Sequence, residues 1–463
     1  MLKRTTSEEE LSSHLSDAGN AARFTRQYRG RLLHCEGAGW LLYDGTRWQQ
    51  AGSEITRLAK ATVSKIYAEA GRYGPLEQRK AVTAWALKSE SERSIRAMVS
   101  LAECELPVKA DALDQDPWLL NCTNGTLNLR TGELQKHNPK DLITKLAPIE
   151  YDPGAKSKLW QCVIIHALPN REVRTFFQKL VGYTLTGCTG EDIFALIHGP
   201  TRTSKGTVQE AIATMLGDYA ITCELDVLAE RNRAGGPRPE ITRLRGARMV
   251  SIYETSRRMV LSASLVKTLA GSDPVTARAL YQAPITFKPA AKIWVATNHL
   301  PRVPADDDAL WERIREIPFE VPIPEGERDP SVRSKLREPE HGAAILAWAV
   351  KGCLLWQAEG LAQPDAVREA GRAYRVAMDP IARFIEECCI LGPQLWTASV
   401  TLREEYATWC REQGETPESG DALTSKLRGV GCEPQKNSRR GGRGWKGIGI
   451  SGSHLAVARE ADQ

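Results

Sequence analysis

An apolar strand that runs into a lysine-containing loop and then a helix constrains this chain more than any other feature. Residues 193–197 are apolar, residues 199–205 read Gly-Pro-Thr-Arg-Thr-Ser-Lys, and the next residues share one helical face at Val208, Ala211 and Ile212. In this arrangement, amides at a helix start bind phosphate oxygens, and the lysine reaches the β- and γ-phosphates. We therefore predict a phosphate-binding loop. The alternative is an ordinary strand–loop–helix with a surface lysine.

The loop departs from the usual phosphate-binding pattern around its lysine. Ser204 stands where glycine is usual, and Gly206 stands where serine or threonine is usual, so that the nearest hydroxyl, on Thr207, comes one residue late. The candidate nucleotide-binding residues are Gly199, Pro200, Thr201, Arg202, Thr203, Ser204, Lys205, Gly206 and Thr207.

Four apolar segments alternate with helical patterns in the middle of the chain. They are Ile193–Ile197, Met249–Tyr253, Ile293–Thr297 and Ile314–Phe319. Such alternation is typical of a parallel sheet flanked by helices, so we expect an α/β fold. Two stretches with apolar residues around turn residues, at 40–48 and 124–132, predict hairpins in the N-terminal part.

Polar residues follow these strands in an order that suits nucleotide chemistry. Glu254 ends the second strand and is a candidate to hold magnesium, with Thr207 as a second candidate ligand. Asn298 ends the third strand and is placed to orient a water near the γ-phosphate. Arg313 and Arg315 are candidate arginine fingers for a neighbouring subunit.

Composition argues against a membrane-spanning, secreted or cysteine-ligated metal protein. No apolar run approaches the ~20 residues that a membrane span needs, and the polar N-terminus has no apolar signal core, so we expect a cytoplasmic protein. The eleven cysteines lack a Cys-x-x-Cys pair, which favours free thiols in a reducing compartment over metal ligands. The net charge of +5 says little about partners.

The last 80 or so residues have their own pattern. Helical patterns at 381–391, 402–413 and 421–430 precede a predicted hairpin with a basic turn. Three helices and a basic hairpin are typical of a winged helix, whose third helix enters the major groove while the hairpin contacts phosphates. The candidate DNA contacts here are Lys426, Arg428, Arg439, Arg440 and Arg443. Binding of a protein instead of DNA is the alternative.

Four blocks of the chain resemble the superfamily 3 helicases of phage and plasmid primase-helicase proteins, which are related to the poxvirus primase-helicase. The blocks are Asp116–Gly132 with Tyr151-Asp-Pro; the lysine loop through Tyr219; Leu269–Arg278 running on to Pro301; and Trp311–Phe319. The resemblance covers roughly residues 20–450, and the third block is its most specific part.

The resemblance implies a ring-shaped AAA+-type ATPase, normally a homo-hexamer, that uses ATP and Mg²⁺ to translocate on DNA. It implies Lys205 as the phosphate-binding lysine, Glu254 as the Walker B acid, Asn298 as the sensor, and Arg313 as the finger with Arg315 as second choice. Residues 277–292 look like the hairpin that points into the ring's channel, where the candidate phosphate contacts are Arg278, Lys288 and Lys292. A separate primase or loader is an expected partner.

The implied organisation has four parts. They are an N-terminal α+β domain (1–150), a helical lead-in with the P-loop ATPase core (151–325), a helical linker (326–378) and the winged helix (379–463). Because the chain begins where the family's helicase half begins, we expect no polymerising primase domain.

Departures from the family pattern keep a second function open. Besides Ser204 and Gly206, the chain has Ser256 where the family usually has a second Walker B acid. The leading hypothesis is an ATP-dependent helicase that replicates a phage, plasmid or integrated element. The others are an origin-binding or DNA-clamping ring with weak ATPase activity and, less favoured, a small-molecule kinase. The sequence does not give the origin, the polarity of unwinding or the host.

Overall fold

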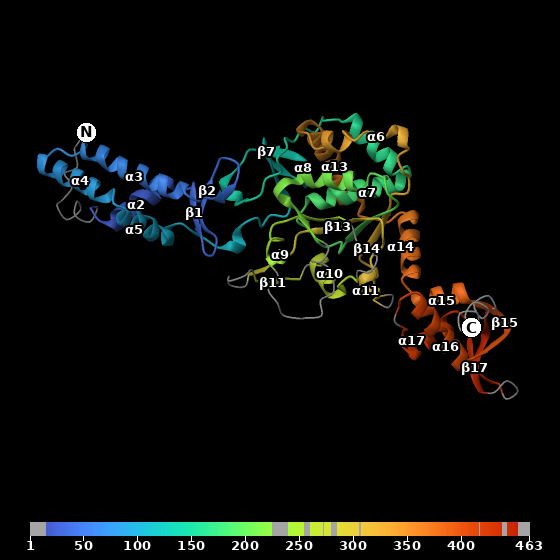
Figure 1. Cartoon of the computed structure of the whole chain (residues 1–463). Helices are drawn as coiled ribbons and strands as arrows, with labels where there is room; N and C mark the ends of the chain where they lie inside the picture. Colours follow the sequence, from blue (N-terminus) through green and yellow to red (C-terminus); the bar gives the residue numbers. More distant parts are fainter. Residues whose placement is uncertain are drawn as a thin grey trace.

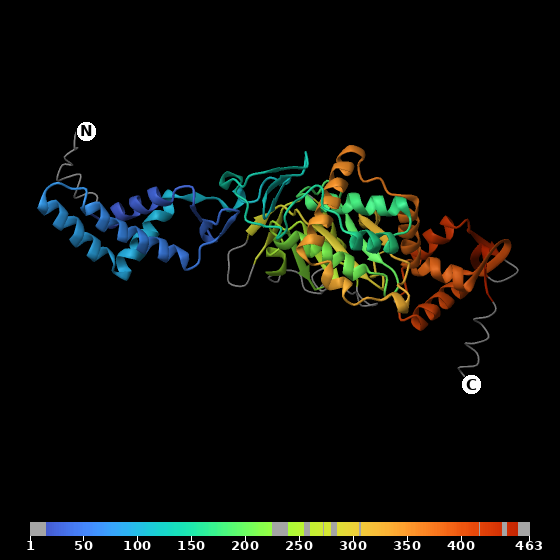
Figure 2. The same cartoon turned by 90° about the horizontal axis from the view of Figure 1, so that it is seen from above.

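A computed structural model describes residues 15–224, 239–253, 260–271, 273–278, 285–304, 307–415, 417–437 and 442–451. The molecule is elongated, with N-terminal helices at one end, a sheet-containing core in the middle and a small C-terminal unit at the other end (Figures 1 and 2). No described helix is long and apolar enough to cross a membrane.

In the described residues from 15 onward, the N-terminal end has four α-helices and a small sheet. Ser16 and Ser91 cap the first and last of these helices by accepting backbone hydrogen bonds. The sheet has the order β3-β2-β1-β4, and the predicted hairpin at 40–48 is confirmed as the antiparallel pair β2–β3. The elements are α2 (Asp17–Tyr28), β1 (Leu32–Cys35), β2 (Gly39–Tyr43), β3 (Trp48–Gln50), α3 (Glu54–Ala70), α4 (Leu76–Ser89), α5 (Glu92–Ala102) and β4 (Pro107–Val108).

A second small sheet packs into the core of the middle part. It has the order β5-β6-β7, and the predicted hairpin at 124–132 is confirmed by the antiparallel pair β6–β7. Leu120, Leu127 and Ile149 lie in one buried cluster with helices α6 and α7, so the expected boundary at residue 150 falls inside a shared core. The elements are β5 (Leu119–Cys122), β6 (Gly125–Asn128), β7 (Glu133–Gln135), α6 (Lys158–Ala167) and α7 (Arg171–Leu185).

The central sheet has five parallel strands in the order β14-β8-β13-β10-β9. The four predicted strands are confirmed within one residue at each end, and β9 is an additional, partly exposed edge strand without an apolar run. The strands are β8 (Phe194–His198), β9 (Ala220–Cys223), β10 (Met249–Tyr253), β13 (Lys292–Thr297) and β14 (Ile314–Pro318).

Helices cover both faces of this sheet (Figure 1). Alternate residues of β8 explain this: Ala195 and Ile197 enter one core with α7, α8 and α13, while Phe194 and Leu196 enter the other with α10, α11 and Tyr374 of α14. The covering helices are α8 (Lys205–Leu216), α10 (Ala263–Ala270), α11 (Asp308–Trp311), α13 (Pro339–Glu359) and α14 (Asp365–Ala377). Shorter elements are α9 (Pro239–Thr242), β11 (Val275–Ala277), β12 (Ile285–Phe287) and α12 (Val332–Lys335).

The C-terminal unit has three helices, as predicted, and a three-stranded sheet of order β15-β17-β16. The predicted hairpin is confirmed as β16–β17, but residues 389–391 begin a strand and do not continue the first helix. Glu415 accepts hydrogen bonds from Arg383 within the unit at 2.7 Å and lies 3.8 Å from Arg302 of the middle part. The elements are α15 (Pro380–Cys388), β15 (Cys389–Ala398), α16 (Ser399–Glu412), α17 (Gly420–Gly429), β16 (Glu433–Asn437) and β17 (Gly442–Ile450).

Candidate functional site

The loop of residues 199–204 follows the carboxyl end of β8, between two neighbouring strands. Its first residue, Gly199, has φ +154°, and a Cβ there would lie 1.9 Å from the carbonyl oxygen of Phe319. Phe319 in turn donates its amide to the carbonyl of His198 at 2.7 Å. The chain just beyond β14 therefore presses against the loop, and only glycine fits at its start.

The loop turns into α8 through two residues with left-handed backbone. Arg202 has φ +65° and Ser204 has φ +67°, a region that side chains other than glycine rarely adopt. Ser204 precedes the first residue of α8, and its side chain makes no capping hydrogen bond. The amides of the first turn of α8 therefore lack a side-chain cap and face the loop, where an anion can accept their hydrogen bonds.

Lys205 is held inside the loop by three acceptors. Its ammonium donates to the carbonyls of Gly199 at 2.7 Å and Pro200 at 2.6 Å, and to the hydroxyl of Thr203 at 3.1 Å. The residue is 7% exposed, and burial lowers the pKa of the ammonium to about 8. A positive charge thus lies at the N-terminus of α8, which has no side-chain cap.

The next two residues of α8 differ in what they offer a ligand. Gly206 has no side chain, and a Cβ built there meets nothing within 4 Å, so a larger residue would fit. Thr207 is half-buried on the first helical turn and carries the nearest hydroxyl after the lysine.

The neighbouring strands end at the same edge of the sheet. Thr297 of β13 is paired with His198 of β8, so Asn298 and Gly199 each lie one residue beyond a paired position, and Asn298 is exposed. Tyr253 ends β10, paired with Ala296. Glu254, the candidate acid that follows Tyr253, lies outside the described residues. The structure thus brings Lys205 and Asn298 to one edge.

The two candidate arginine fingers lie at the opposite edge. Arg315 pairs with Ala195 near the amino end of β8, which places it about 13 Å of strand away from Gly199, and Arg313 lies two residues farther. Arg313 donates to the carbonyl of Ala309 at 2.6 Å and lies 3.3 Å from a carboxylate oxygen of Asp192. Burial lowers the pKa of Arg315. Both arginines therefore lie at the end of the strands away from the loop.

The candidate channel hairpin is formed by β11 and β12, which pair antiparallel, and it carries two of its three candidate cations. Arg278 and Lys288 are exposed near its strand ends. Lys292 corrects the prediction, because it is 2% exposed as the first residue of β13. Its ammonium donates to the carbonyls of Thr186 and Ala290, and burial lowers the pKa of Lys292 well below its usual value. In this position it cannot touch DNA.

Arg248, which directly precedes β10, is buried beside Lys292. Its guanidinium donates to the carbonyls of Leu185 and Leu119 and lies 4.5 Å from the centre of the Tyr219 ring. Leu185 and Thr186 end α7, so carbonyls at the negative end of a helix stabilise both cations.

The C-terminal candidates divide into paired and exposed cations. Lys426 of α17 forms an ion pair of 2.5 Å with Asp379, the residue that caps α15, whereas Arg428 and Arg443 are exposed. Arg439 and Arg440 lie outside the described residues. Two of the five predicted contacts therefore have charges directed to solvent, and Lys426 has a partner within the fold.

Sequence reasoning missed the most buried polar side chain next to the loop. Gln209 is 0% exposed, and its amide joins α8 to the sheet. The signal was available, because Gln209 lies among the apolar positions Val208, Ala211 and Ile212, where a polar residue is out of place. His198 was also missed; its Nδ1 lies 2.8 Å from Glu316 on β14.

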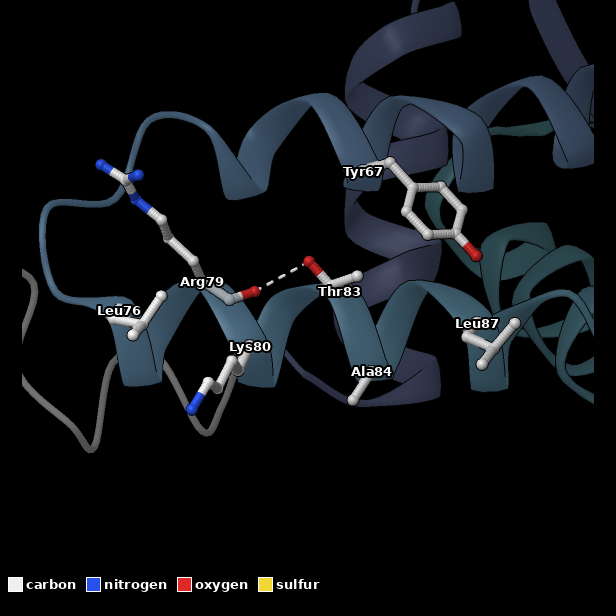
Figure 3. Close-up of a pocket in the computed structure, with 7 residues that line it drawn as sticks. All are labelled: Tyr67, Leu76, Arg79, Lys80, Thr83, Ala84 and Leu87. Atoms are coloured by element: carbon white, nitrogen blue, oxygen red, sulfur yellow. Dashed lines mark hydrogen bonds between the residues drawn. The ribbon is translucent and has the colours of Figure 1, made fainter.

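A separate hollow of about 530 Å³ lies far from this edge, on the N-terminal helices (Figure 3). Leu76 and Leu87 of α4 are exposed at its two ends, and Tyr67 of α3 forms one wall. Its distance from the sheet, seen in Figure 1, excludes it from the site around Lys205.

This chain is similar in sequence to a known protein family and to several viral proteins. Residues 21–169 match the protein family described as “D5 N terminal like”. A “Putative helicase” of Acanthamoeba polyphaga mimivirus is 29% identical over 212 residues, which is 45% of this chain and 22% of that protein. “Putative helicase 121R” of Invertebrate iridescent virus 3 is 28% identical over 311 residues, 60% of this chain and 33% of that protein.

A “Putative primase” of African swine fever virus is 26% identical over 323 residues, 64% of this chain and 34% of that protein. The chain matches between 22% and 34% of the length of these relatives. The family match and the viral relatives together support a primase-helicase family for this chain.

Proposed function

We propose that the chain is an ATP-dependent DNA helicase of superfamily 3 that acts in the replication of a phage, plasmid or integrated element. The observation that carries the proposal is the position of Lys205. It is buried at the start of α8, which lacks a side-chain cap, beside the carboxyl end of β8, and Asn298 follows the neighbouring strand β13. Ligands of parallel sheets bind at this edge. The viral relatives named as helicases support the same function.

The residues at the edge fit a nucleoside triphosphate. The 199–204 loop and the first amides of α8 would surround the phosphates, and Lys205 would exchange its carbonyl partners for β- and γ-phosphate oxygens. Thr207 and Glu254 are the proposed magnesium ligands; bound Mg²⁺ would neutralise charge on the phosphates. Asn298 would orient the attacking water.

The position of the arginines supports a ring of subunits. Arg313 and Arg315 lie at the edge opposite the loop, where an arginine finger would act on a neighbour's nucleotide. We therefore propose a homo-hexamer with Arg313 as the finger. Arg278 and Lys288 on the β11–β12 hairpin are the proposed contacts to a strand in the channel.

The C-terminal unit is proposed to be a winged helix that binds duplex or origin DNA. Its third helix, α17, exposes Arg428, and the hairpin β16–β17 exposes Lys436 and Arg443 opposite each other. Exposed cations on a helix and on a hairpin are the pattern that contacts phosphates. A separate primase or loader is a proposed partner.

A second function is favoured by the loop itself. Ser204 adopts a left-handed backbone that suits glycine, and Gly206 offers no hydroxyl to a metal ion. A ring that binds ATP and clamps origin DNA with little hydrolysis is therefore the alternative.

One measurement separates these functions: ATP hydrolysis by the purified protein with and without DNA, beside Lys205→Ala. DNA-stimulated hydrolysis that is lost in the variant supports the helicase. Nucleotide and DNA binding without hydrolysis supports the clamp. Equal hydrolysis by both proteins contradicts the assignment of Lys205.

A further inference from the structure

The amide of Gln209 spans two strands of the central sheet from the first turns of α8. Its Nε2 lies 2.8 Å from the hydroxyl of Ser251, 3.0 Å from the carbonyl of Ile252 and 3.3 Å from the carbonyl of Trp294. Ser251 of β10 and Trp294 of β13 are paired in register, so the amide bonds the two strands at one point. Among the described residues of α8, no other side chain donates hydrogen bonds to both β10 and β13.

This point lies between the parts of the proposed nucleotide site. Gln209 follows Lys205 by one helical turn. Along the strands, Tyr253 and then Glu254 follow Ile252, and Asn298 lies four residues beyond Trp294. The amide therefore fixes the distance between the phosphate-binding end of α8 and the two strand ends that carry the acid and the water-orienting amide.

Stability alone does not explain why glutamine occupies position 209. Its Oε1 is buried without a hydrogen-bond partner, and a buried unpaired oxygen is destabilising. A leucine or methionine would fill the same space without that penalty, as the apolar neighbours on α8 do.

We infer that Gln209 is a positioning residue that holds Lys205 in register with the described ends of β10 and β13, an inference that rests on the proposed ATP chemistry. Lys205 is the first residue of α8 and hydrogen-bonds the loop directly, so we expect nucleotide binding not to need the amide of Gln209. The alignment of the γ-phosphate with groups on β10 and β13 does need it.

The test compares Gln209→Leu and Gln209→Met with Gln178→Met. Gln178 is a matched control, because its amide also donates to a backbone carbonyl, that of Trp348 at 2.9 Å, but joins α7 to α13 away from the loop. For the Gln209 variants we expect kcat for ATP to fall ~10- to 100-fold, as for a misplacement of about 1 Å, with the Kd for ADP within about 3-fold of wild type. Thermal unfolding of each variant would show that it is folded under the assay conditions.

A double mutant separates positioning from general destabilisation. Ser251→Ala removes one acceptor of the same amide, so Gln209→Leu with Ser251→Ala should be no slower than Gln209→Leu alone. Equal kcat in wild type and both Gln209 variants overturns the inference, as does a parallel loss in Gln178→Met.

If the wild-type protein hydrolyses no ATP, that result counts against the proposed function but not against the positioning role of Gln209. Amide hydrogen exchange then tests the positioning role. Faster exchange of amides in 199–205 and 252–254 in Gln209→Leu, but not in Gln178→Met, supports positioning. Identical exchange in wild type and Gln209→Leu overturns it.

Discussion

The α-carbon of Gly199 faces the carbonyl oxygen of Phe319 so closely that a Cβ would lie 1.9 Å from it. The contact joins the start of the loop to the chain that follows β14. Gly199→Ala should therefore displace the loop and abolish nucleotide binding, and it should lower the melting temperature. Fluorescence titration with a labelled ADP and thermal unfolding would measure both effects. Gly206→Ala, which places a Cβ in open space, is the control and should bind normally.

Ser204→Gly should stabilise the protein. A left-handed backbone at φ +67° costs a residue other than glycine about 1 kcal/mol, and glycine removes that strain. We expect the free energy of unfolding to rise by about 0.5–1 kcal/mol in urea titrations, with ATP turnover equal or higher. Ser204→Ala should show no such gain. A lower stability of the glycine variant would mean that the hydroxyl of Ser204 has a role of its own.

Nucleotide affinity should depend on pH through Lys205. Burial holds the pKa of this ammonium at about 8, below the ordinary 10.5, because the folded protein disfavours the charged form. The resulting penalty on the free energy of unfolding is full below pH 8 and diminishes as pH rises from about 8 towards 10.5. Phosphates bind the protonated form. Affinity for ADP should therefore be constant below pH 8 and fall as pH rises through it. Isothermal titration at pH 7 and pH 9 would show this, and Lys205→Ala should remove the difference.

Arg313→Ala should retain nucleotide binding and lose hydrolysis, by a factor of ~10³–10⁵ if it acts as a finger. Mixing this variant with Lys205→Ala subunits should restore part of the activity, because mixed rings contain intact pairs. Arg315→Ala serves as the comparison. Light scattering that finds only monomers with ATP and DNA present would contradict the ring.

The exposed C-terminal cations should control the salt dependence of DNA binding. Each phosphate contact contributes a slope of roughly −0.9 in log K against log salt, so Arg428→Ala and Arg443→Ala should each flatten the slope by about that amount. Lys426→Ala should change it less, because Lys426 is paired with Asp379. Anisotropy of a labelled duplex between 50 and 200 mM salt would measure this. Slopes identical to wild type in both arginine variants would favour a protein partner for this unit.

The sequence predicted β8, β10 and β13 because each is a short, largely apolar run that ends in or is followed by a polar residue at the sheet edge. It could not predict β9, whose residues are partly exposed, or the strand that begins at Cys389, where helical and extended patterns overlap. Among the site residues, Lys205 and Asn298 followed from their positions after strands. Lys292 was misplaced because a lysine after a turn reads as exposed, and only the carbonyls at the end of α7 explain its burial.

Arg248 and Lys292 anchor the starts of β10 and β13 to the last carbonyls of α7 and, through Leu119, to β5. The amino side of the sheet is thus joined to two other elements, α7 and β5, by buried charged side chains. The opposite side ends in loops. We therefore expect β10 and β13 to keep their register at the amino side of the sheet when the loop around Lys205 changes conformation.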